Sequence, residues 1–375
     1  MIIAVNTRLL VSGKLEGLGI FAFETLKRIT RSHPEHRFVF FFDRKWPDEF
    51  IFSDNIEPLI LFPPARHPFL WYLFFEHAVP AALKKVKADL FLSPDGWMSL
   101  RTEVRSVDVI HDINFEYYPE FIKPLERKYY HYFFPRFARK ADRIATVSEF
   151  SKQTIISRYD QPAGKIDVVY NGVSDGYKPL KQNEMMLIRQ KYTEGMPYFI
   201  FIGLLHPRKN IANLFRAYDL FRMKGGERIR LLIVGEKKWW KGEMEQVYEQ
   251  MQFREDVVFT GRLPLADLQQ AMAAALALVY VSVFEGFGIP LIEAMKSGIP
   301  VIAGNVTSMP EVAGDAALLA DPFSPPSIAE AMEKISSDEK LRAGLIKKGV
   351  ERCSHFSWDK TAEALWNCIE KSLSR

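Results

Sequence analysis

Short runs of apolar residues, bounded by Gly, Pro, Asn, Asp or Ser, alternate along this chain with longer stretches in which apolar residues recur at helical spacing. The short runs are typical of buried strands, and the longer stretches are typical of helices that cover a sheet. Their alternation predicts an α/β fold with parallel sheets and crossover helices. The predicted strands cover residues 2–6, 38–42, 59–62, 90–93, 106–111, 143–147 and 166–170, then 198–203, 230–235, 257–260, 277–281, 301–303 and 317–319.

The two groups of strands imply two sheets in two domains. Between them, residues 171–195 are rich in Gly, Pro, Lys and Gln and lack a sustained apolar period until a short helix near 185–192. Such a segment is typical of an interdomain connection. We place the boundary near Lys178, which gives an N-terminal domain over 1–178 and a C-terminal domain over 179–355.

The last residues, 356–375, are predicted to form one more amphipathic helix. Ser357 suits its N-cap, and Ala362, Leu365 and Ile369 recur on one helical face. We expect this helix to pack back on the N-terminal domain.

Composition narrows the class of protein. A chain of 375 residues with 48% hydrophobic and 26% charged residues buries a sizeable core, which excludes a small module and bulk disorder. Lys and Arg number 50 against 46 Asp and Glu, and this small surplus argues against a nucleic-acid partner.

The compartment is expected to be reducing and cytoplasmic. Cys353 and Cys368 lack the spacing of a disulfide scaffold or a zinc site. Residues 1–8 lack the basic start of a secretory signal, and the longest apolar stretch, 271–284, is shorter than the roughly 20 residues of a membrane-spanning helix.

The stretch 285–298, E-G-F-G-I-P-L-I-E-A-M-K-S-G, carries the most specific chemistry. It follows the predicted strand 277–281, Pro290 suits the first turn of a helix, and Gly298 suits the position after its end. The pattern therefore predicts a strand, a glycine-containing loop and a short helix. The start of such a helix offers backbone N–H groups and a positive dipole end, which commonly hold phosphate.

Glu285 and Glu293 stand eight residues apart in this stretch. If the segment is largely helical, their backbones are separated by roughly 12 Å. Glycosidase carboxyl groups stand roughly 5 to 9.5 Å apart, so this pair fits better the two ends of one long polar ligand, such as a sugar nucleotide. The alternative is a pair of solvated helix residues.

The pattern E-G-F-G-x-P-x-x-E-A-M, followed by S-G-I-P-V at 297–301 and P-E-V-A-G-D-A at 310–316, resembles that of the retaining glycosyltransferases of family 4. The resemblance covers most of the chain. It implies the GT-B fold, in which two Rossmann-like domains face each other across a cleft. It also implies that Glu285 lies near the donor sugar and that Glu293 hydrogen-bonds the nucleotide ribose. The diphosphate would be held by the loop of Gly286, Phe287, Gly288, Ile289 and Pro290.

A second group opens the C-terminal domain, where Gly203 begins the sequence G-L-L-H-P-R-K-N. Cations at this position neutralise the charge that develops on a leaving diphosphate. The family pattern is often G-R-x-x-x-x-K: Lys209 matches its lysine, while Leu204 replaces its arginine. We infer that Arg208 supplies the second charge. The alternative is an ordinary solvated pair.

Two features of the N-terminal domain point to the same cleft. Gly17 and Gly19 lie in the loop after the first strand, and the lack of a third glycine argues against a dinucleotide-binding loop. His111 ends the predicted strand 106–111, the edge at which open α/β sheets bind ligands. The resemblance places the Gly loop at the diphosphate or acceptor and His111 near the donor sugar and acceptor. The alternatives are a plain turn and a structural histidine.

Four further residues match family positions near the cleft, the hinge or the nucleobase: Ser148, Asn171, Gly261 and Arg262. By themselves they indicate only a helix cap and turns. No Asp-x-Asp follows a strand, and His and carboxylates show no ligand spacing, so we predict neither a catalytic metal nor a cofactor.

A basic and aromatic segment suggests a membrane surface. Residues 123–143 carry seven basic and two acidic side chains around the aromatic run 129–134, and a second aromatic cluster covers 69–75. This composition suits an anionic leaflet, so we take peripheral contact with the inner membrane face as a hypothesis. The alternative is burial of these aromatics between helix and sheet.

The sequence thus predicts an enzyme that transfers a hexose from a nucleotide-diphosphate sugar to a saccharide or lipid-linked saccharide, with retention at the anomeric carbon. GDP-mannose is the expected donor, because the P-R-K-N loop resembles that of bacterial mannosyltransferases of polysaccharide assembly. The alternatives are a catalytically silent sugar-binding or partner subunit, and an epimerase or phosphorylase on the same fold.

Overall fold

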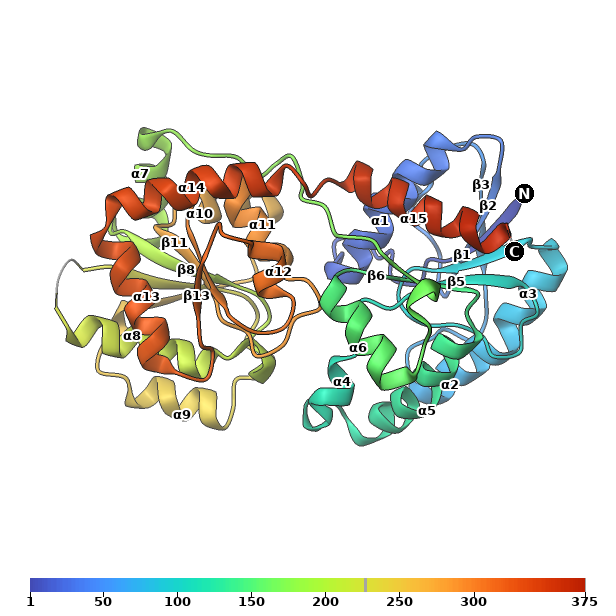
Figure 1. Ribbon diagram of the computed structural model, residues 1–375, viewed down its shortest axis with the longest axis horizontal. Helices are drawn as coiled ribbons and strands as arrows, with labels where there is room; N and C mark the ends of the chain where they lie inside the picture. Colours follow the sequence, from blue (N-terminus) through green and yellow to red (C-terminus); the bar gives the residue numbers. More distant parts are fainter. Residues whose placement is uncertain (226–227, 375) are drawn as a thin grey trace. The chain divides into compact units, whose positions relative to one another are not determined.

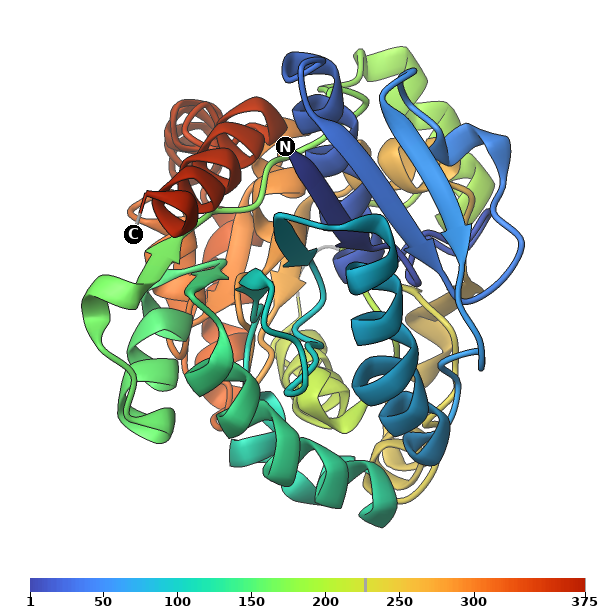
Figure 2. The ribbon, with the colours of Figure 1, turned by 90° about the vertical axis from the view of Figure 1, so that its right-hand side faces the viewer.

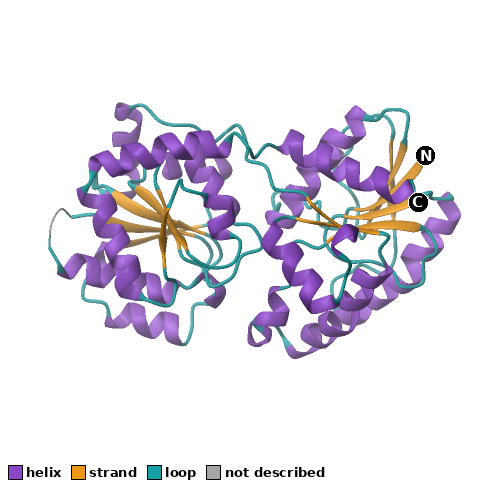
Figure 3. Ribbon diagram, in the orientation of Figure 1, coloured by secondary structure: helices purple, strands orange, loops and turns teal. Residues whose placement is uncertain are grey.

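The computed structural model describes residues 1–225 and 228–374 and divides into two compact units (Figure 1). The first unit holds Met1–Gly172 and the C-terminal segment from Trp358. The second holds Val173–Ser357. The predicted boundary near Lys178 lies a few residues further along the chain. Each unit is one parallel sheet between layers of helices (Figure 3).

The first unit is built on a seven-stranded sheet in the order β3-β2-β1-β4-β5-β6-β7, in which all paired strands are parallel. The chain runs outward from β1 through β2 to β3 and then returns to the other side of β1 to add β4 and the strands beyond it. The point where the order reverses therefore lies between β1 and β4. The strands are β1 (Ile2–Asn6), β2 (Arg37–Phe42), β3 (Ile56–Ile60), β4 (Leu90–Ser93), β5 (Arg105–Val109), β6 (Arg143–Thr146) and β7 (Ile166–Val168).

Helices cover both faces of this sheet (Figure 2). The α-helices are α1 (Gly17–Ser32), α2 (Pro68–Leu73), α3 (Val79–Val86), α4 (Asn114–Tyr117), α5 (Pro124–Lys140), α6 (Glu149–Tyr159) and α15 (Trp358–Leu373). A π-helical turn, Phe74–Ala78, joins α2 to α3, and short 3₁₀ turns cover Asp48–Phe50, Pro119–Phe121 and Ala163–Lys165.

The C-terminal helix α15 packs in the first unit, against α1, β5 and β6. Leu365 and Ile369 are fully buried on its inner face. The Thr361 hydroxyl donates to the Tyr170 carbonyl at 2.7 Å, and Lys371 Nζ lies 2.7 Å from Asp167 Oδ1. The apolar face of this C-terminal helix thus completes the hydrophobic core of the first unit.

The second unit repeats the same plan with a six-stranded parallel sheet in the order β10-β9-β8-β11-β12-β13. Its order reverses between β8 and β11. The strands are β8 (Tyr198–Ile202), β9 (Arg230–Val234), β10 (Val257–Gly261), β11 (Ala277–Tyr280), β12 (Val301–Gly304) and β13 (Leu318–Ala320). The α-helices are α7 (Gln182–Thr193), α8 (Ile211–Met223), α9 (Glu243–Gln250), α10 (Leu265–Ala273), α11 (Ile289–Lys296), α12 (Met309–Ala313), α13 (Pro325–Ser337) and α14 (Glu339–Cys353), with 3₁₀ turns over Pro207–Lys209 and Arg254–Asp256.

The observed strands confirm the α/β prediction, and most of their ends lie within two residues of those expected. The strand predicted over 59–62 is wrong in position, because β3 begins at Ile56 and pairs along β2. Glu57 and Pro58 interrupt the apolar run there. β3 is an edge strand, so exposed Glu57 can pair with Arg37 and the missing N–H of Pro58 is tolerated.

No helix among the described residues is long and apolar enough to cross a membrane. The aromatic segments singled out above are divided between core and surface. Trp71, Tyr129 and Phe134 are buried, whereas Phe69 is 65% and Tyr132 53% exposed. Burial therefore accounts for part of both segments, and membrane contact stays a prediction that rests on the outer face of α5.

Candidate active site

The second unit brings two predicted motifs together where its strand order reverses. Lys209 and its neighbours follow β8, and Glu285 follows β11, the strand that pairs with β8. The carboxyl ends of parallel strands meet at one edge of a sheet, and in open α/β sheets ligands bind beside the reversal point. Residues 76 positions apart in sequence thereby share one site.

Both predicted cations contact the Glu285 carboxylate. Lys209 Nζ lies 2.6 Å from Oε1, and Arg208 Nη1 lies 3.0 Å from Oε2. The Glu285 side chain is 9% exposed, that of Lys209 12% and that of Arg208 21%, so the cluster is mostly shielded from water. Two cations and one carboxylate leave a net positive charge at this edge.

This cluster fixes the charge of Glu285. Burial by itself raises the pKa of a carboxyl group, but the adjoining Arg208 and Lys209 outweigh it and lower the pKa of Glu285 to about 2. Burial and the Glu285 carboxylate together raise the pKa of Tyr280, so its phenol stays neutral and its hydroxyl donates to Glu285 Oε1 at 3.1 Å.

Two further polar side chains hold the surrounding backbone. Asn210 donates to the carbonyls of Val281 and Pro322 at 2.9 and 2.6 Å, which ties the loop after β8 to the end of β11. The Ser308 hydroxyl donates to the carbonyls of Glu285 and Phe287 at 2.9 and 3.1 Å, which fixes the loop before α11.

The predicted strand, loop and helix at 277–298 are confirmed as β11, a loop and α11. Gly288 caps α11 with a φ of +95°, a conformation that favours glycine, and Pro290 lies in its first turn. Phe287 is buried, while Ile289 and Pro290 are half-buried. The amino end of α11 therefore opens at the edge that holds Lys209 and Glu285, as a phosphate site requires.

Glu293 lies on α11 and is half-buried. Burial raises the pKa of its carboxyl to about 7, despite a hydrogen bond from the buried Tyr177 hydroxyl that lowers the pKa. Tyr177 belongs to the connecting segment, which also contacts α11 through an ion pair between Asp175 and Lys296 at 2.5 Å. The connection thus holds the helix that carries Glu293.

The remaining predicted residues of this unit also lie at carboxyl ends of strands. Gly203 follows β8, and a Cβ added at Gly235, after β9, would stand 1.8 Å from the Gly203 carbonyl oxygen. Gly261 ends β10 with a φ of +69° beside a register shift, and the exposed Arg262 follows it. Gly235 therefore permits the close approach of the loops after β8 and β9, and Gly261 permits the turn after β10.

In the first unit, His111 lies just beyond β5 and is half-buried. Its Nε2 stands 2.9 Å from the carbonyl oxygen of Pro94, and since a carbonyl only accepts, Nε2 carries the proton and Nδ1 the lone pair. Burial lowers the pKa of His111, although Asp112 and Asp95 oppose the shift. His111 is thus neutral at pH 7, with a basic nitrogen.

The other predicted residues of the first unit have mainly structural surroundings. The prediction that Gly17 and Gly19 lie in the loop after the first strand is wrong, because α1 begins at Gly17 and contains both. A Cβ added at Gly19 would stand 3.0 Å from the Leu9 carbonyl oxygen. Buried Ser148 caps α6 by accepting from the Ser151 N–H at 3.0 Å. Asn171 is buried, and its Oδ1 has no hydrogen-bond partner among the described residues. Their ligand roles stay predictions.

The one group of described His, Cys, Asp or Glu side chains close enough to share a metal ion is His33, Glu35 and His36. It precedes β2 and so lies at the amino edge of the first sheet, away from the strand ends considered above. The absence of a catalytic metal stays a prediction.

Comparison with known proteins identifies the family. The family model of group 1 glycosyl transferases matches residues 187–352, and that of Glycosyltransferase Family 4 matches residues 16–176. O-antigen chain mannosyltransferase B of Escherichia coli is 30% identical over 294 residues, which cover 78% of this chain and 75% of that protein. The chain belongs to glycosyltransferase family 4. O-antigen chain mannosyltransferase RfbU of Salmonella typhimurium is 29% identical over 263 residues, which cover 70% of this chain and 69% of the relative.

Solved structures place this glycosyltransferase in the GT-B fold, as predicted. Sucrose-phosphate synthase from Thermosynechococcus elongatus superposes with a TM-score of 0.80 at 18% identity, covering 100% of this chain and 99% of that one. HepE of Anabaena, solved in complex with UDP-glucose, superposes with a TM-score of 0.75 at 19% identity over the full length of both chains.

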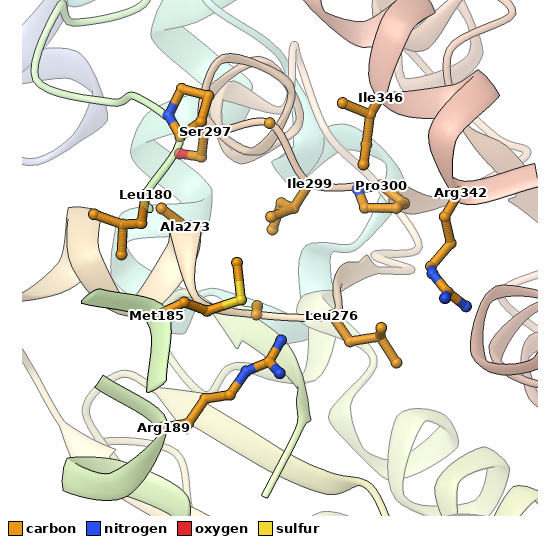
Figure 4. A pocket seen from close by; sticks show the side chains of 13 residues that line it. Leu180, Met185, Arg189, Ala273, Leu276, Ser297, Ile299, Pro300, Arg342 and Ile346 are labelled. Carbon is orange, nitrogen blue, oxygen red and sulfur yellow. The ribbon is translucent and has the colours of Figure 1, made fainter. Parts of the chain in front are cut away.

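Two hollows of the glycosyltransferase lie away from these strand ends. One, of about 190 Å³, is lined by Leu276 and Pro300 before β11 and β12, by the connection at Leu180, and by Arg189 and Arg342 (Figure 4). It therefore lies at the amino edge of the second sheet. The other, of about 810 Å³, lies between α1 and α15 in the first unit. Neither contains a predicted site residue.

Sequence reasoning missed several residues of the glycosyltransferase that hold the site, chiefly Tyr177, Tyr280 and Asn210. Asn210 lies in the P-R-K-N loop, so its neighbours could have drawn attention to it. Tyr177 has no local signal, because it reaches Glu293 on another element. Tyr280 lies only five positions before Glu285, but as the last residue of a buried strand it is not distinguished from ordinary core residues.

Proposed function

We propose that the enzyme transfers a hexose from a nucleotide-diphosphate sugar to a saccharide or lipid-linked saccharide, with retention of configuration. The observation that carries this proposal is the cluster of Arg208 and Lys209 on Glu285, placed beside the amino end of α11 at the reversal point of the second sheet. A diphosphate is the ligand that two cations and a helix amino end suit best.

The cations act on the leaving group. As the bond between the anomeric carbon and the diphosphate oxygen breaks, negative charge grows on the diphosphate. Each cation at about 4 Å contributes roughly 4 kcal/mol of Coulomb energy at an effective dielectric near 20, before desolvation costs. Only the part that increases in the transition state speeds the reaction. We assign this role to Lys209 and Arg208.

The carboxylates bind the rest of the donor. Glu285, ionised by its two cations, accepts hydrogen bonds from donor-sugar hydroxyls, and Glu293 binds the ribose hydroxyls. Gly286 to Pro290 approach the phosphates with their backbone. We assign the nucleobase to the edge near Gly261 and Arg262.

The acceptor attacks without an enzyme nucleophile. Its hydroxyl oxygen bonds to the anomeric carbon on the face that the diphosphate leaves, and its proton passes to an oxygen of the departing diphosphate, so charges and atoms balance. We place the acceptor near Gly17 and His111, whose neutral imidazole keeps a lone pair on Nδ1 that can accept a hydrogen bond from an acceptor hydroxyl.

Mannose from GDP-mannose is the donor we propose. The support is twofold: two relatives carry the name O-antigen chain mannosyltransferase, and the P-R-K-N loop matches the pattern expected of such enzymes. We further propose that the enzyme works in the cytoplasm, at the inner membrane face, where a lipid-linked acceptor is presented.

A panel of nucleotide sugars tests the proposal. GDP-mannose at 100 times its dissociation constant should add about 2.7 kcal/mol to the free energy of unfolding, which a thermal shift detects, whereas UDP-glucose and UDP-galactose should add less. Transfer to mannobiose is then followed by mass spectrometry. Binding without transfer to any saccharide would favour a silent subunit. A changed sugar without an acceptor would indicate an epimerase, and a need for free phosphate would indicate a phosphorylase.

A further inference from the structure

The reversal point of the first sheet holds an ion pair that repeats the arrangement seen in the second. Arg8 follows β1 and Asp95 follows β4, the two strands between which the order turns, and Arg8 Nε lies 2.8 Å from Asp95 Oδ2. In the second unit Lys209 and Glu285 follow β8 and β11 in the same way. Each sheet thus carries a cation and a carboxylate across the place where open α/β sheets bind ligands.

Asp95 is fixed by its neighbours and holds Arg8 rigidly. The Asp95 side chain is 2% exposed, and its Oδ1 accepts from Asn6 Nδ2 at 2.8 Å and from the Ser93 hydroxyl at 3.1 Å. The Arg8 guanidinium also lies over the ring of Trp97, 4.6 Å from its centroid. A guanidinium clamped by a carboxylate and an aromatic ring loses little freedom when it binds a further group.

Most of the hydrogen-bonding capacity of Arg8 is unused. Only Nε–H of its five side-chain N–H groups has an acceptor among the described residues, and the side chain is 11% exposed. The two terminal nitrogens of Arg8 have no acceptor among the described residues and are not fully buried, so both reach solvent. Shielded donors held in place without acceptors point to a ligand rich in oxygen atoms.

The charges around Arg8 favour an uncharged ligand. Asp95 already balances the guanidinium. Asp108 pairs in register with Ser93 on the neighbouring strand, and burial together with Asp95 raises the pKa of its carboxyl well above its usual range. His111 adds no positive charge at pH 7, because burial lowers its pKa. Hydroxyl groups therefore suit this cluster better than a phosphate.

The cluster also adjoins the predicted acceptor residue. The loop after β4 supplies Asp95 to Arg8 and the Pro94 carbonyl to His111, so one short turn positions both side chains. The half-buried ring of Tyr130 lies within electrostatic range of Arg8 and Asp95 and packs 5.5 Å from Trp97. A few convergent polar groups beside aromatic rings are typical of a small-molecule site.

We propose that Arg8, held by Asp95, binds the hydroxyl groups of the acceptor saccharide at the reversal point of the first sheet. This inference rests on the proposed transferase function. Arg8 is then the acceptor-side counterpart of Lys209: its terminal nitrogens donate to two neighbouring sugar oxygens and orient the attacking hydroxyl near His111.

The test compares Arg8→Lys with Arg143→Lys in the full-length protein. Lysine keeps the positive charge beside Asp95 but cannot reach two oxygens with a planar fork. Arg143 is a matched control, because it is a comparably buried arginine of the first unit and is also paired with an aspartate, Asp167. It lies at the amino end of β6, away from the proposed site, and its guanidinium already donates to the Gly164 carbonyl at 2.7 Å.

Arg8→Lys should raise the KM for mannobiose by about 10- to 100-fold, because a hydrogen-bonded charged donor is lost. The thermal shift with GDP and the slow hydrolysis of the donor without acceptor should stay unchanged. Arg143→Lys should leave all three unchanged. A wild-type KM for mannobiose in Arg8→Lys refutes the acceptor site and leaves the transferase proposal standing.

Binding measured by saturation-transfer NMR needs no turnover. Mannobiose should bind the wild-type protein and Arg143→Lys, and should bind Arg8→Lys much more weakly. If this holds while no donor supports transfer, the proposed function fails and the saccharide site stands. The inference is overturned if the wild-type protein does not bind mannobiose. It is also overturned if inorganic phosphate displaces mannobiose from the wild-type protein.

Discussion

The Lys209 ammonium stands 2.6 Å from Oε1 of Glu285, although the two residues are 76 positions apart and belong to loops after different strands. The Tyr280 hydroxyl lies 2.5 Å from the same ammonium and 3.1 Å from the same oxygen. Three side chains from two strand ends thus form one closed polar network, in which the cation that we assign to the diphosphate is held before any ligand arrives.

Replacing Lys209 by Ala should reduce the rate of sugar transfer by at least about 100-fold, which corresponds to roughly 2.7 kcal/mol of barrier, because a cation beside the leaving group is lost. Steady-state kinetics with the best donor measures this. Lys191→Ala, which removes an exposed lysine paired with Asp267 in the same unit, should turn over at the wild-type rate. Near-wild-type turnover of Lys209→Ala contradicts its assigned role.

Replacing Glu285 by Gln should destabilise the protein, because Arg208 and Lys209 would remain shielded from water without their carboxylate. Breaking a buried pair in this way costs about 3 kcal/mol. Urea unfolding at pH 7 gives the difference, and Glu333→Gln, which breaks an exposed pair with Lys224, serves as the control. Since the pKa of Glu285 is about 2, the stability it contributes should be lost only as the pH falls below about 4.5 toward 2. A stability loss no larger than that of the control argues against a buried cluster.

Glu293 should make the stability fall as the pH rises. Its pKa is about 7 in the folded protein, above the ordinary value of 4.5, so the unfolded chain gives up this proton first. As the pH rises from 4.5 to about 7, ionisation of Glu293 increasingly favours the unfolded state. Above about pH 7 the loss of folding stability caused by Glu293 no longer changes with pH. Glu293→Gln removes that cost, so its stability relative to the wild type should increase between pH 5 and pH 8. A pH-independent difference in urea unfolding would be inconsistent with the raised pKa.

Tyr177→Phe should raise the pKa of Glu293 further, because the hydrogen bond from the Tyr177 hydroxyl favours the ionised carboxylate. The carboxyl carbon of Glu293, followed by NMR during a pH titration, reports the shift directly. Tyr192→Phe in α7 is the control. If the pKa of Glu293 is lower or unchanged in Tyr177→Phe, the hydrogen bond from Tyr177 does not set the charge of Glu293.

The outer face of α5 should bind anionic membranes. Tyr132 is 53% exposed with Arg136 stacked 3.8 Å from its ring centroid, and Lys128 and Lys140 are exposed on the same helix. The protein should float with phosphatidylglycerol vesicles but not with phosphatidylcholine vesicles, and Lys128→Glu with Lys140→Glu should weaken flotation. Lys340→Glu in α14 is the matched control. No flotation of the wild type with anionic vesicles counts against membrane contact.

Much of the fold was predictable because its signals are local. An apolar run followed by a turn specifies a strand, and Pro290 and Gly298 mark the two ends of α11 within one short stretch. The same signal fails at β3, where charged Glu57 and Pro58, which has no backbone N–H, interrupt the apolar run. Both residues are tolerated in the strand only because β3 lies at the edge of the sheet.

The sequence by itself determined the two sheets, the family motif, and the presence of Lys209 and Glu285 near strand ends. Only the tertiary structure decided that these two share a site, that Tyr280 joins them, and that Arg8 meets Asp95 from 87 positions away. The reason is that strand order depends on how crossover helices pack on the sheet, and no local pattern of residues encodes which strand ends become neighbours.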